Sequence, residues 1–170
     1  MTETRAVTTI DKAPKLFATS DERFRNAMPS PVKGETPAGW KSLPPKQFRL
    51  LNYSFGADGR GEVWVSMTAG SVLANVNRWL HQFGAQPLDE AGLEKLRKVP
   101  VAGTTGAWVE SAGDYAGGMG AAPETGYAMA GVIADLGDRI LTVKMVGPKS
   151  EVEAARPVLE SFAKGLKLTQ

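Results

Sequence analysis

A strand–turn–strand pattern in the first half of the chain constrains the fold more than any other feature of the sequence. Residues 48–55 are rich in apolar and aromatic side chains, and residues 62–67 alternate apolar and polar side chains. Between them, Asp58-Gly59 supplies the positive φ that a tight hairpin turn needs. In residues 62–67, one face carries Val63, Val65 and Met67, and the other carries Glu62, Trp64 and Ser66. The pattern predicts an antiparallel hairpin.

The second half of the chain adds further strand patterns. Residues 127–134 and 140–146 are largely apolar and flank a short Gly-Asp turn, and residues 99–109 are predicted to form another strand. A glycine-rich segment at 113–126 is predicted to be a long loop. Consecutive strands joined by short turns pair antiparallel, so the sheet is expected to be mainly antiparallel.

Three helices are predicted from the remaining apolar periodicity. The first begins after Ser71 as N-cap and ends at Gly84, and its buried stripe is Leu73, Val76, Leu80 and Phe83. A second helix is predicted at residues 89–98. The last is predicted to begin with Ser150 as its cap, and it contains Pro157. Because the strands are too apolar to face water, helices must cover them, which gives an α+β fold with an antiparallel β-sheet covered by helices.

The domain organisation is predicted to be simple. A length of 170 residues fits one domain. Residues 1–35 show no clean period, which predicts a flexible or partly ordered N-terminal leader before a single α+β domain at residues 36–170. Trp40, which lies between prolines, is expected to close over one end of the core.

Composition excludes several classes of function. The absence of cysteine removes thiolate catalysis and cysteine metal sites, and His81, the single histidine, leaves no histidine cluster. A net charge of +2 without a basic stripe argues against nucleic acid as a partner. No cofactor or metal is implied, and His81 has no nucleophile motif nearby, which favours a binding domain over an enzyme.

The sequence shows neither a membrane-spanning run nor the apolar core of a signal peptide. Two localisations remain open on this basis. The chain is cytoplasmic as written, or a signal or lipid anchor has been removed and the protein lies in the periplasm or cell envelope. Oligomeric state is not readable from the sequence.

The segment at residues 75–82 is the most distinctive candidate site. On a helix, Asn75, Arg78, Trp79 and Gln82 share one face, and Asn77 lies close by. One interpretation is a polar recognition patch with Trp79 as its floor. The other is structural, with the amides and the guanidinium tying the helix to loop carbonyls. The loop at 113–126 adds Tyr115 as a further candidate binding residue, because this loop is able to close over a ligand or partner.

Three motifs together resemble a group of bacterial envelope proteins, often lipoproteins, with a domain similar to the PsbP/DcrB-like fold. The motifs are Pro37-Ala38-Gly39-Trp40, Asn75-Val76-Asn77-Arg78-Trp79 with Gln82, and Val143-Lys144-Met145-Val146-Gly147-Pro148 leading into Glu151-Val152-Glu153-Ala154-Ala155. The resemblance covers residues 37–168 and implies an α/β/α sandwich with an accessory or binding role. It departs from the group in lacking a lipobox cysteine.

Two hypotheses about function follow. The first is a non-enzymatic accessory domain that binds a protein partner or an envelope component through the helix around Arg78, Trp79 and Gln82, the glycine-rich loop, or both. The second is a domain that binds or converts a small molecule, with a pocket under the loop at 113–126 and His81 or Tyr115 at its rim.

Overall fold

The computed structural model describes residues 31–46, 48–116 and 122–168. Most of the predicted leader at residues 1–35 therefore lies outside the described residues, as does the tip of the loop predicted at 113–126. Where the description begins, strand β1 (Val32–Lys33) already pairs antiparallel with the last strand, β9 (Lys167–Leu168). The predicted boundary between residues 35 and 36 stays a prediction.

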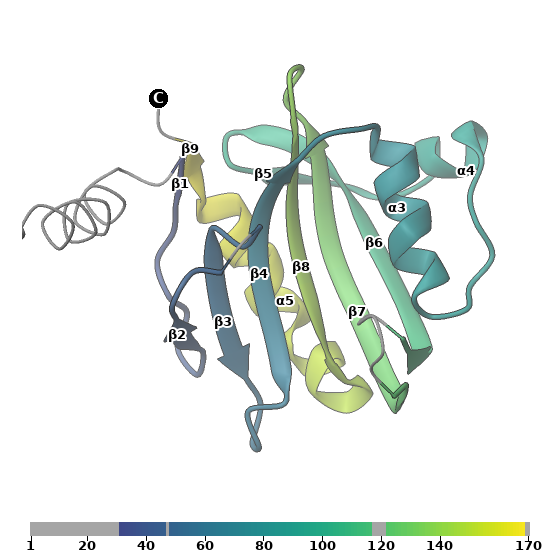
Figure 1. The fold of residues 1–170 in the computed structure, drawn as a ribbon. Coiled ribbons are helices and arrows are strands. Elements are labelled where there is room, and N and C mark those ends of the chain that lie inside the picture. The colour runs from purple at the N-terminus through teal and green to yellow at the C-terminus, as the bar shows by residue number, and fades with distance from the viewer. Residues whose placement is uncertain (1–30, 47, 117–121, 169–170) are drawn as a thin grey trace, which may run out of the picture. The chain divides into compact units, whose positions relative to one another are not determined.

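The main element is a seven-stranded sheet in which every neighbouring pair is antiparallel. Figure 1 shows the long strands β4, β8, β7 and β6 side by side at its centre. In spatial order the strands are β2 (Lys41–Leu43), β3 (Leu51–Phe55), β4 (Gly61–Thr68), β8 (Ile140–Pro148), β7 (Glu124–Asp135), β6 (Thr104–Tyr115) and β5 (Lys98–Val101). The prediction of an antiparallel sheet is confirmed.

The predicted hairpin is present as β3 and β4, with Leu51 opposite Val65 and Phe55 opposite Gly61. The first strand is shorter than predicted because it begins at Leu51 rather than at residue 48. Phe48 has a φ of 69° and is 78% exposed, so it lies in a left-handed turn outside the sheet.

The single strand predicted at residues 99–109 is wrong. The chain turns at Ala102 and Gly103, whose φ values are 50° and 78°, and these residues separate β5 from β6. Two consecutive residues with positive φ match the right-handed twist of the flanking strands, so the segment forms a hairpin.

The predicted loop at 113–126 is also partly strand, because β6 continues to Tyr115 and β7 starts at Glu124.

Three helices follow the predicted order, and all three differ from the prediction at one end or both. They are α3 (Val72–His81), α4 (Glu90–Glu94) and α5 (Lys149–Gly165). The first begins after Ser71 as predicted but ends at His81, with Gln82 rather than Gly84 as its C-cap. The second helix is shorter than residues 89–98, although Asp89 caps it as predicted. Ser150 is not the cap of the last helix, because Pro148 holds that position and offers no side-chain cap. None of these helices, nor any other helix in the described segments, has the length and apolar character to cross a membrane.

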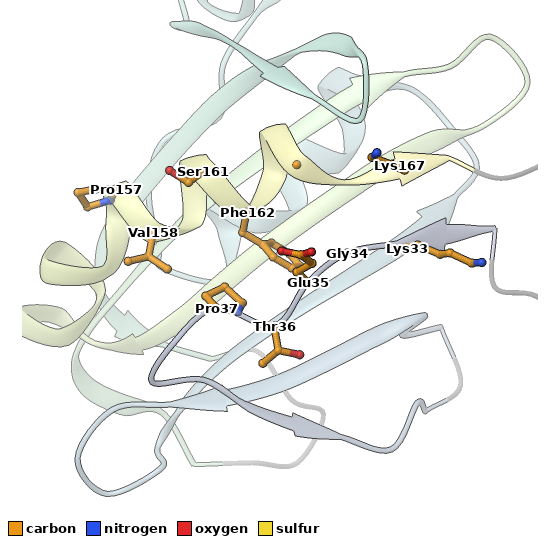
Figure 2. Close-up of a pocket in the computed structure, with 11 residues that line it drawn as sticks. Lys33, Gly34, Glu35, Thr36, Pro37, Pro157, Val158, Ser161, Phe162 and Lys167 are labelled. Atoms are coloured by element: carbon orange, nitrogen blue, oxygen red, sulfur yellow. The ribbon is translucent and has the colours of Figure 1, made fainter.

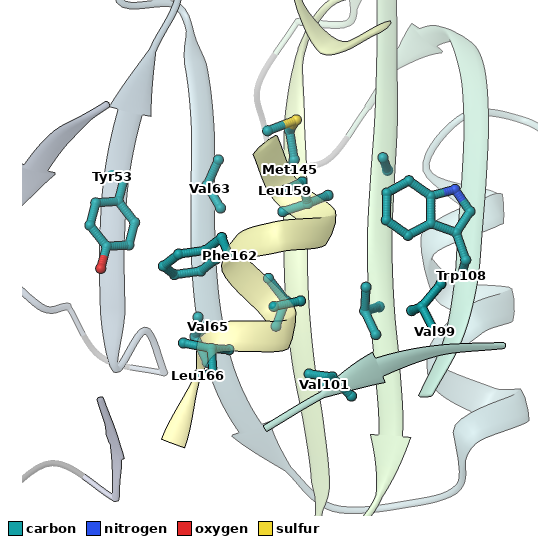
Figure 3. Packing of buried hydrophobic residues seen from close by; sticks show 14 of the residues in the cluster. Tyr53, Val63, Val65, Val99, Val101, Trp108, Met145, Leu159, Phe162 and Leu166 are labelled. Carbon is teal, nitrogen blue, oxygen red and sulfur yellow. The ribbon is translucent and has the colours of Figure 1, made fainter. Parts of the chain in front are cut away.

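Helices α3 and α5 lie on opposite faces of the sheet (Figure 1). Along β6, Trp108 packs into the core beneath α5, whereas its neighbours Ala107 and Val109 pack with α3. Figure 3 shows Leu159 and Phe162 of α5 among the strand residues of the first core. The expected α/β/α arrangement is therefore present.

Trp40 closes one end of the α5-side core, as the sequence predicts. Its ring centroid lies 5.5 Å from that of Tyr53 and 5.1 Å from that of Phe162. Only 9% of Trp40 is exposed. The burial of Tyr53 in this group raises the pKa of its phenol.

Candidate ligand-binding site

A row of residues across the three central strands positions the candidate site. Lys144 in β8 lies opposite Trp64 in β4 and opposite Gly131 in β7. A Cβ atom on Gly131 would lie 2.8 Å from the indole ring of Trp79, so glycine leaves the space that this ring occupies. Trp79 comes from α3, and the row therefore joins three strands and one helix on the α3 face.

The amino group of Lys144 is buried among aromatic rings. Lys144 is 3% exposed, and its Nζ lies 5.5 Å, 5.4 Å and 5.7 Å from the ring centroids of Trp64, Trp79 and Tyr115. We call these three rings the aromatic cage. The Nζ also donates a hydrogen bond to Oε1 of Gln82. Ring faces within about 6 Å attract an ammonium group, which offsets part of the cost of its desolvation.

The charged form of Lys144 nevertheless has little electrostatic support. None of the ion pairs among the described residues includes Lys144 or Arg78. Burial, followed by the positive charges of Arg78 and Arg49, lowers the pKa of Lys144 to about 7. The amino group is therefore close to half protonated near neutral pH.

A cavity of about 400 Å³ opens beside this amino group, between α3 and the β4–β8 pair. We call it the Lys144 pocket. It combines three basic groups, indole walls and several small polar side chains. Its lining residues are Phe48, Arg49, Trp64, Ser66, Met67, Thr68, Arg78, Trp79, Gln82, Thr142 and Lys144.

The two arginines of the pocket are held differently. The guanidinium of Arg49 stacks on Trp64, with its Cζ atom 3.9 Å from the ring centroid, and pairs with Glu62 at 2.8 Å. Arg78 donates one hydrogen bond of 2.7 Å to Oδ1 of Asn75, a neutral group. Among the described residues, Glu62 is the one carboxylate that pairs with any of the three basic side chains, which leaves this part of the pocket with an excess of positive charge.

The structure divides the predicted site residues into two groups. Arg78, Trp79 and Gln82 line the pocket together, and Tyr115 completes the aromatic cage. The two asparagines instead hold α3 to neighbouring backbone, as the structural interpretation predicts. Asn75 is buried and donates to the carbonyl of Ser71 at 2.8 Å, and Asn77 exchanges two hydrogen bonds with the backbone of Leu88. Whether any of these residues binds a ligand stays a prediction.

Tyr115 owes its position to two neighbouring rings. It stacks on Tyr127 with centroids 6.1 Å apart and lies 5.1 Å from Phe83. Burial of the phenol raises its pKa.

Among the described residues that line the Lys144 pocket, none belongs to 113–126. His81 is exposed and is not among the lining residues.

Sequence reasoning missed Lys144, Arg49 and Trp64 as parts of one site. The available signal was a single lysine inside the apolar strand at 140–146, because a charged residue in the centre of a covered sheet has to be buried. Its two cross-strand neighbours are not readable from the sequence, since they depend on the register with β4 and β7.

A second hollow, of about 870 Å³, lies between the segment at residues 33–37 and the C-terminal half of α5 (Figure 2). Most of its lining side chains are exposed, including the charged groups of Lys33, Glu35 and Lys167. Its buried side chain is the apolar ring of Phe162. Because none of the described residues that line this hollow is a buried polar one, it offers less for specific recognition than the Lys144 pocket.

Metal coordination finds no support in the described parts of the chain, where no group of three or more carboxylate or imidazole side chains comes together. Within the same parts, the Ser66 hydroxyl of the pocket donates to the carbonyl of Phe48 and has no imidazole partner. The chemistry that the pocket offers is therefore that of guanidinium groups, an amine, amide and hydroxyl groups, and aromatic rings.

No protein family matches this sequence, and no curated protein is similar to it in sequence. Three solved structures show a distant similarity in fold. A protein from Bacteroides thetaiotaomicron has a TM-score of 0.49 and 12% identity, over 82% of this chain and 46% of that chain. LpqN, involved in cell envelope biogenesis of Mycobacterium tuberculosis, has a TM-score of 0.49 and 14% identity, over 82% and 83%.

The third structure is the cyanobacterial PsbP (CyanoP) of Synechocystis, with a TM-score of 0.48 and 7% identity, over 82% of this chain and 88% of that chain. The chain spans less than half the length of the Bacteroides protein. All three TM-scores are below 0.5. The α+β fold described above therefore rests on the strand order and register of this chain.

Proposed function

We propose that this chain is a binding domain that holds a small anionic ligand, carrying a carboxylate or phosphate group, in the Lys144 pocket. The observation that carries the proposal is the buried amino group of Lys144, which lines a cavity together with Arg49 and Arg78 and has no carboxylate partner among the described residues. A buried basic group is costly when unpaired, and an anion in the pocket supplies the missing partner.

The arginines suit this role because of their geometry. A guanidinium presents planar, forked donors that match a carboxylate or phosphate, and the hydrogen bond from Arg78 to Asn75 leaves further donors available. The stacking of Arg49 on Trp64 fixes the direction of its plane. The indole rings lower the local dielectric on their side of the pocket, which strengthens a charged hydrogen bond formed beside them.

Isothermal titration calorimetry with lactate, inorganic phosphate and neutral lactamide tests the proposal. We expect at least one anion to bind and the amide not to bind. Arg78→Gln removes one charged hydrogen bond, worth roughly 1.5–3 kcal/mol, and should weaken binding about tenfold or more. Arg97→Gln is the matched control, because Arg97 pairs with Glu160 of α5 on the other face. The proposal fails if neither anion binds, or if both variants lose affinity equally.

The pH dependence of anion binding has a defined sign. An anion beside Lys144 favours its ammonium form, so binding takes up a proton. With a pKa of about 7, the ammonium form dominates near pH 6 and is the minor form near pH 8. Affinity should therefore fall by up to about tenfold between these pH values, and the variant Lys144→Met should show no such fall.

A protein partner is a second candidate, favoured by one observation. Phe48, at the rim of the Lys144 pocket, is 78% exposed and is held in a left-handed conformation. An exposed aromatic side chain beside a basic pocket fits the predicted accessory domain, whose partner or envelope component would place an acidic group in the pocket. The predicted periplasmic or envelope location belongs with this candidate. Loss of partner recovery in Phe48→Ala, with unchanged lactate binding, would separate the two candidates.

A further inference from the structure

We propose that Lys144 is also a nucleophile, which forms a reversible imine with an anionic carbonyl compound such as a 2-oxo acid. This inference rests on the proposed function, because the arginines that bind the anion would also position the carbonyl group. Lys144 is one of the residues that line the cavity, and its amino group lies among the rings of the aromatic cage. An anion held in this cavity by the arginines would place its carbonyl group next to Lys144, as imine formation requires.

The surroundings of the amino group are those that activate a lysine. A lysine becomes nucleophilic when it is desolvated in an apolar site or placed beside another cation, since both favour the neutral amine. Lys144 has both features, with burial by the rings and with Arg78 and Arg49 nearby. With a pKa of about 7, about half of Lys144 is neutral at pH 7, compared with fewer than about one in a thousand exposed lysines.

The step balances without any further reagent. The lone pair on Nζ adds to the carbonyl carbon, and the carbonyl oxygen takes up a proton as the nitrogen loses one. The nitrogen lone pair then expels the hydroxyl group, which leaves with a proton as water. The net change is amine plus carbonyl compound giving imine plus water, and nothing is oxidised or reduced. The amide oxygen of Gln82, which accepts from Nζ, orients the amine.

The test is reductive trapping of the wild-type protein with pyruvate and sodium cyanoborohydride, followed by peptide mass spectrometry. Lys144 should be modified at least about tenfold faster than the exposed Lys149 and Lys164, because its neutral fraction is far larger. Lactate, which has no carbonyl group, should leave no adduct. Modification of Lys144 no faster than that of Lys149 would overturn the inference.

A variant that keeps Lys144 and changes Arg78 tests the positioning of the ligand without removing the reacting amine. Arg78→Gln should slow trapping by pyruvate more than trapping by acetone, a neutral ketone of similar size, because loss of the Arg78 charge raises the pKa of Lys144 for both reagents but removes a carboxylate partner from pyruvate alone. Equal slowing of both reagents, or of neither, would contradict the positioning of an anionic carbonyl compound by Arg78. Calorimetry with lactate keeps the two proposals apart. If lactate binds but Lys144 is not trapped, the imine proposal alone is refuted. If there is no trapping and neither lactate nor phosphate binds, the proposed function is refuted as well.

Discussion

The burial of Lys144 predicts a specific dependence of stability on pH. The ordinary pKa of a lysine is 10.5, and in the folded protein the pKa of Lys144 is lowered to about 7 by burial and by the two arginines. Below pH 7 the lysine is charged in both the folded and unfolded states. The folded state is then destabilised by the full free energy of burying the charged amino group. That shift corresponds to about 5 kcal/mol of folding free energy.

The sign follows from proton binding. Between about pH 7 and pH 10.5 the unfolded chain holds a proton that the folded protein has released, so stability rises with pH across this window. Lys144→Met keeps an unbranched side chain, one atom shorter than that of lysine, and removes the charge. Between about pH 6 and pH 9, wild-type stability should therefore rise by roughly 2–3 kcal/mol relative to the variant. At pH 6 the variant should be the more stable protein.

Urea denaturation of both proteins, in a buffer without phosphate or carboxylate, measures the effect. All other titrating groups are common to the two proteins and largely cancel in the difference. Lys149→Met serves as the control, because Lys149 is exposed. If the stability curves of wild type and Lys144→Met run parallel from pH 6 to pH 9, the amino group is not desolvated and the reasoning about the pocket fails.

Three further substitutions test separate parts of the structure. Gly131→Ala should displace the ring of Trp79, lower stability by about 1–3 kcal/mol and change tryptophan fluorescence, whereas an unaltered spectrum would contradict the close approach. Asn77→Ala should cost about 1–2 kcal/mol and speed amide exchange at Leu88, whose backbone it bonds, and unchanged exchange there would refute that link. Phe48→Gly should raise the melting temperature by relieving about 1 kcal/mol of left-handed strain, and a fall would show that the ring stabilises the fold.

The site could be predicted only in part. Residues 75–82 stood out because amides, a guanidinium and an indole share one helical face, and three of these side chains do line the pocket. The sequence could not separate Asn77, which bonds the backbone of Leu88, from Arg78, which faces the cavity. Helical spacing gives the face of a helix but not what packs against it.

The sequence by itself determined the elements whose signals are local. The Asp58-Gly59 turn and the N-cap at Asp89 each depend on residues a few positions apart, and each is present. The predicted stripe of α3 is present in part, because Val76 and Leu80 are buried whereas Leu73 is half-buried and Phe83 lies beyond the end of the helix. Ala102 lacks the turn signature of glycine or asparagine, and for this reason the sequence predicts one strand where the structure has the β5–β6 hairpin.

Only the tertiary structure decided that Lys144 is a buried amine with a lowered pKa. Its pKa depends on Trp64, Trp79 and two arginines, which reach it through the register of β4 with β8 and through the packing of α3 on Gly131. Desolvation and Coulomb interactions act through space over a few ångströms. A sequence gives the order of such groups along the chain but not the distances between them in space. A surface lysine and a buried lysine therefore cannot be distinguished without the arrangement of the strands.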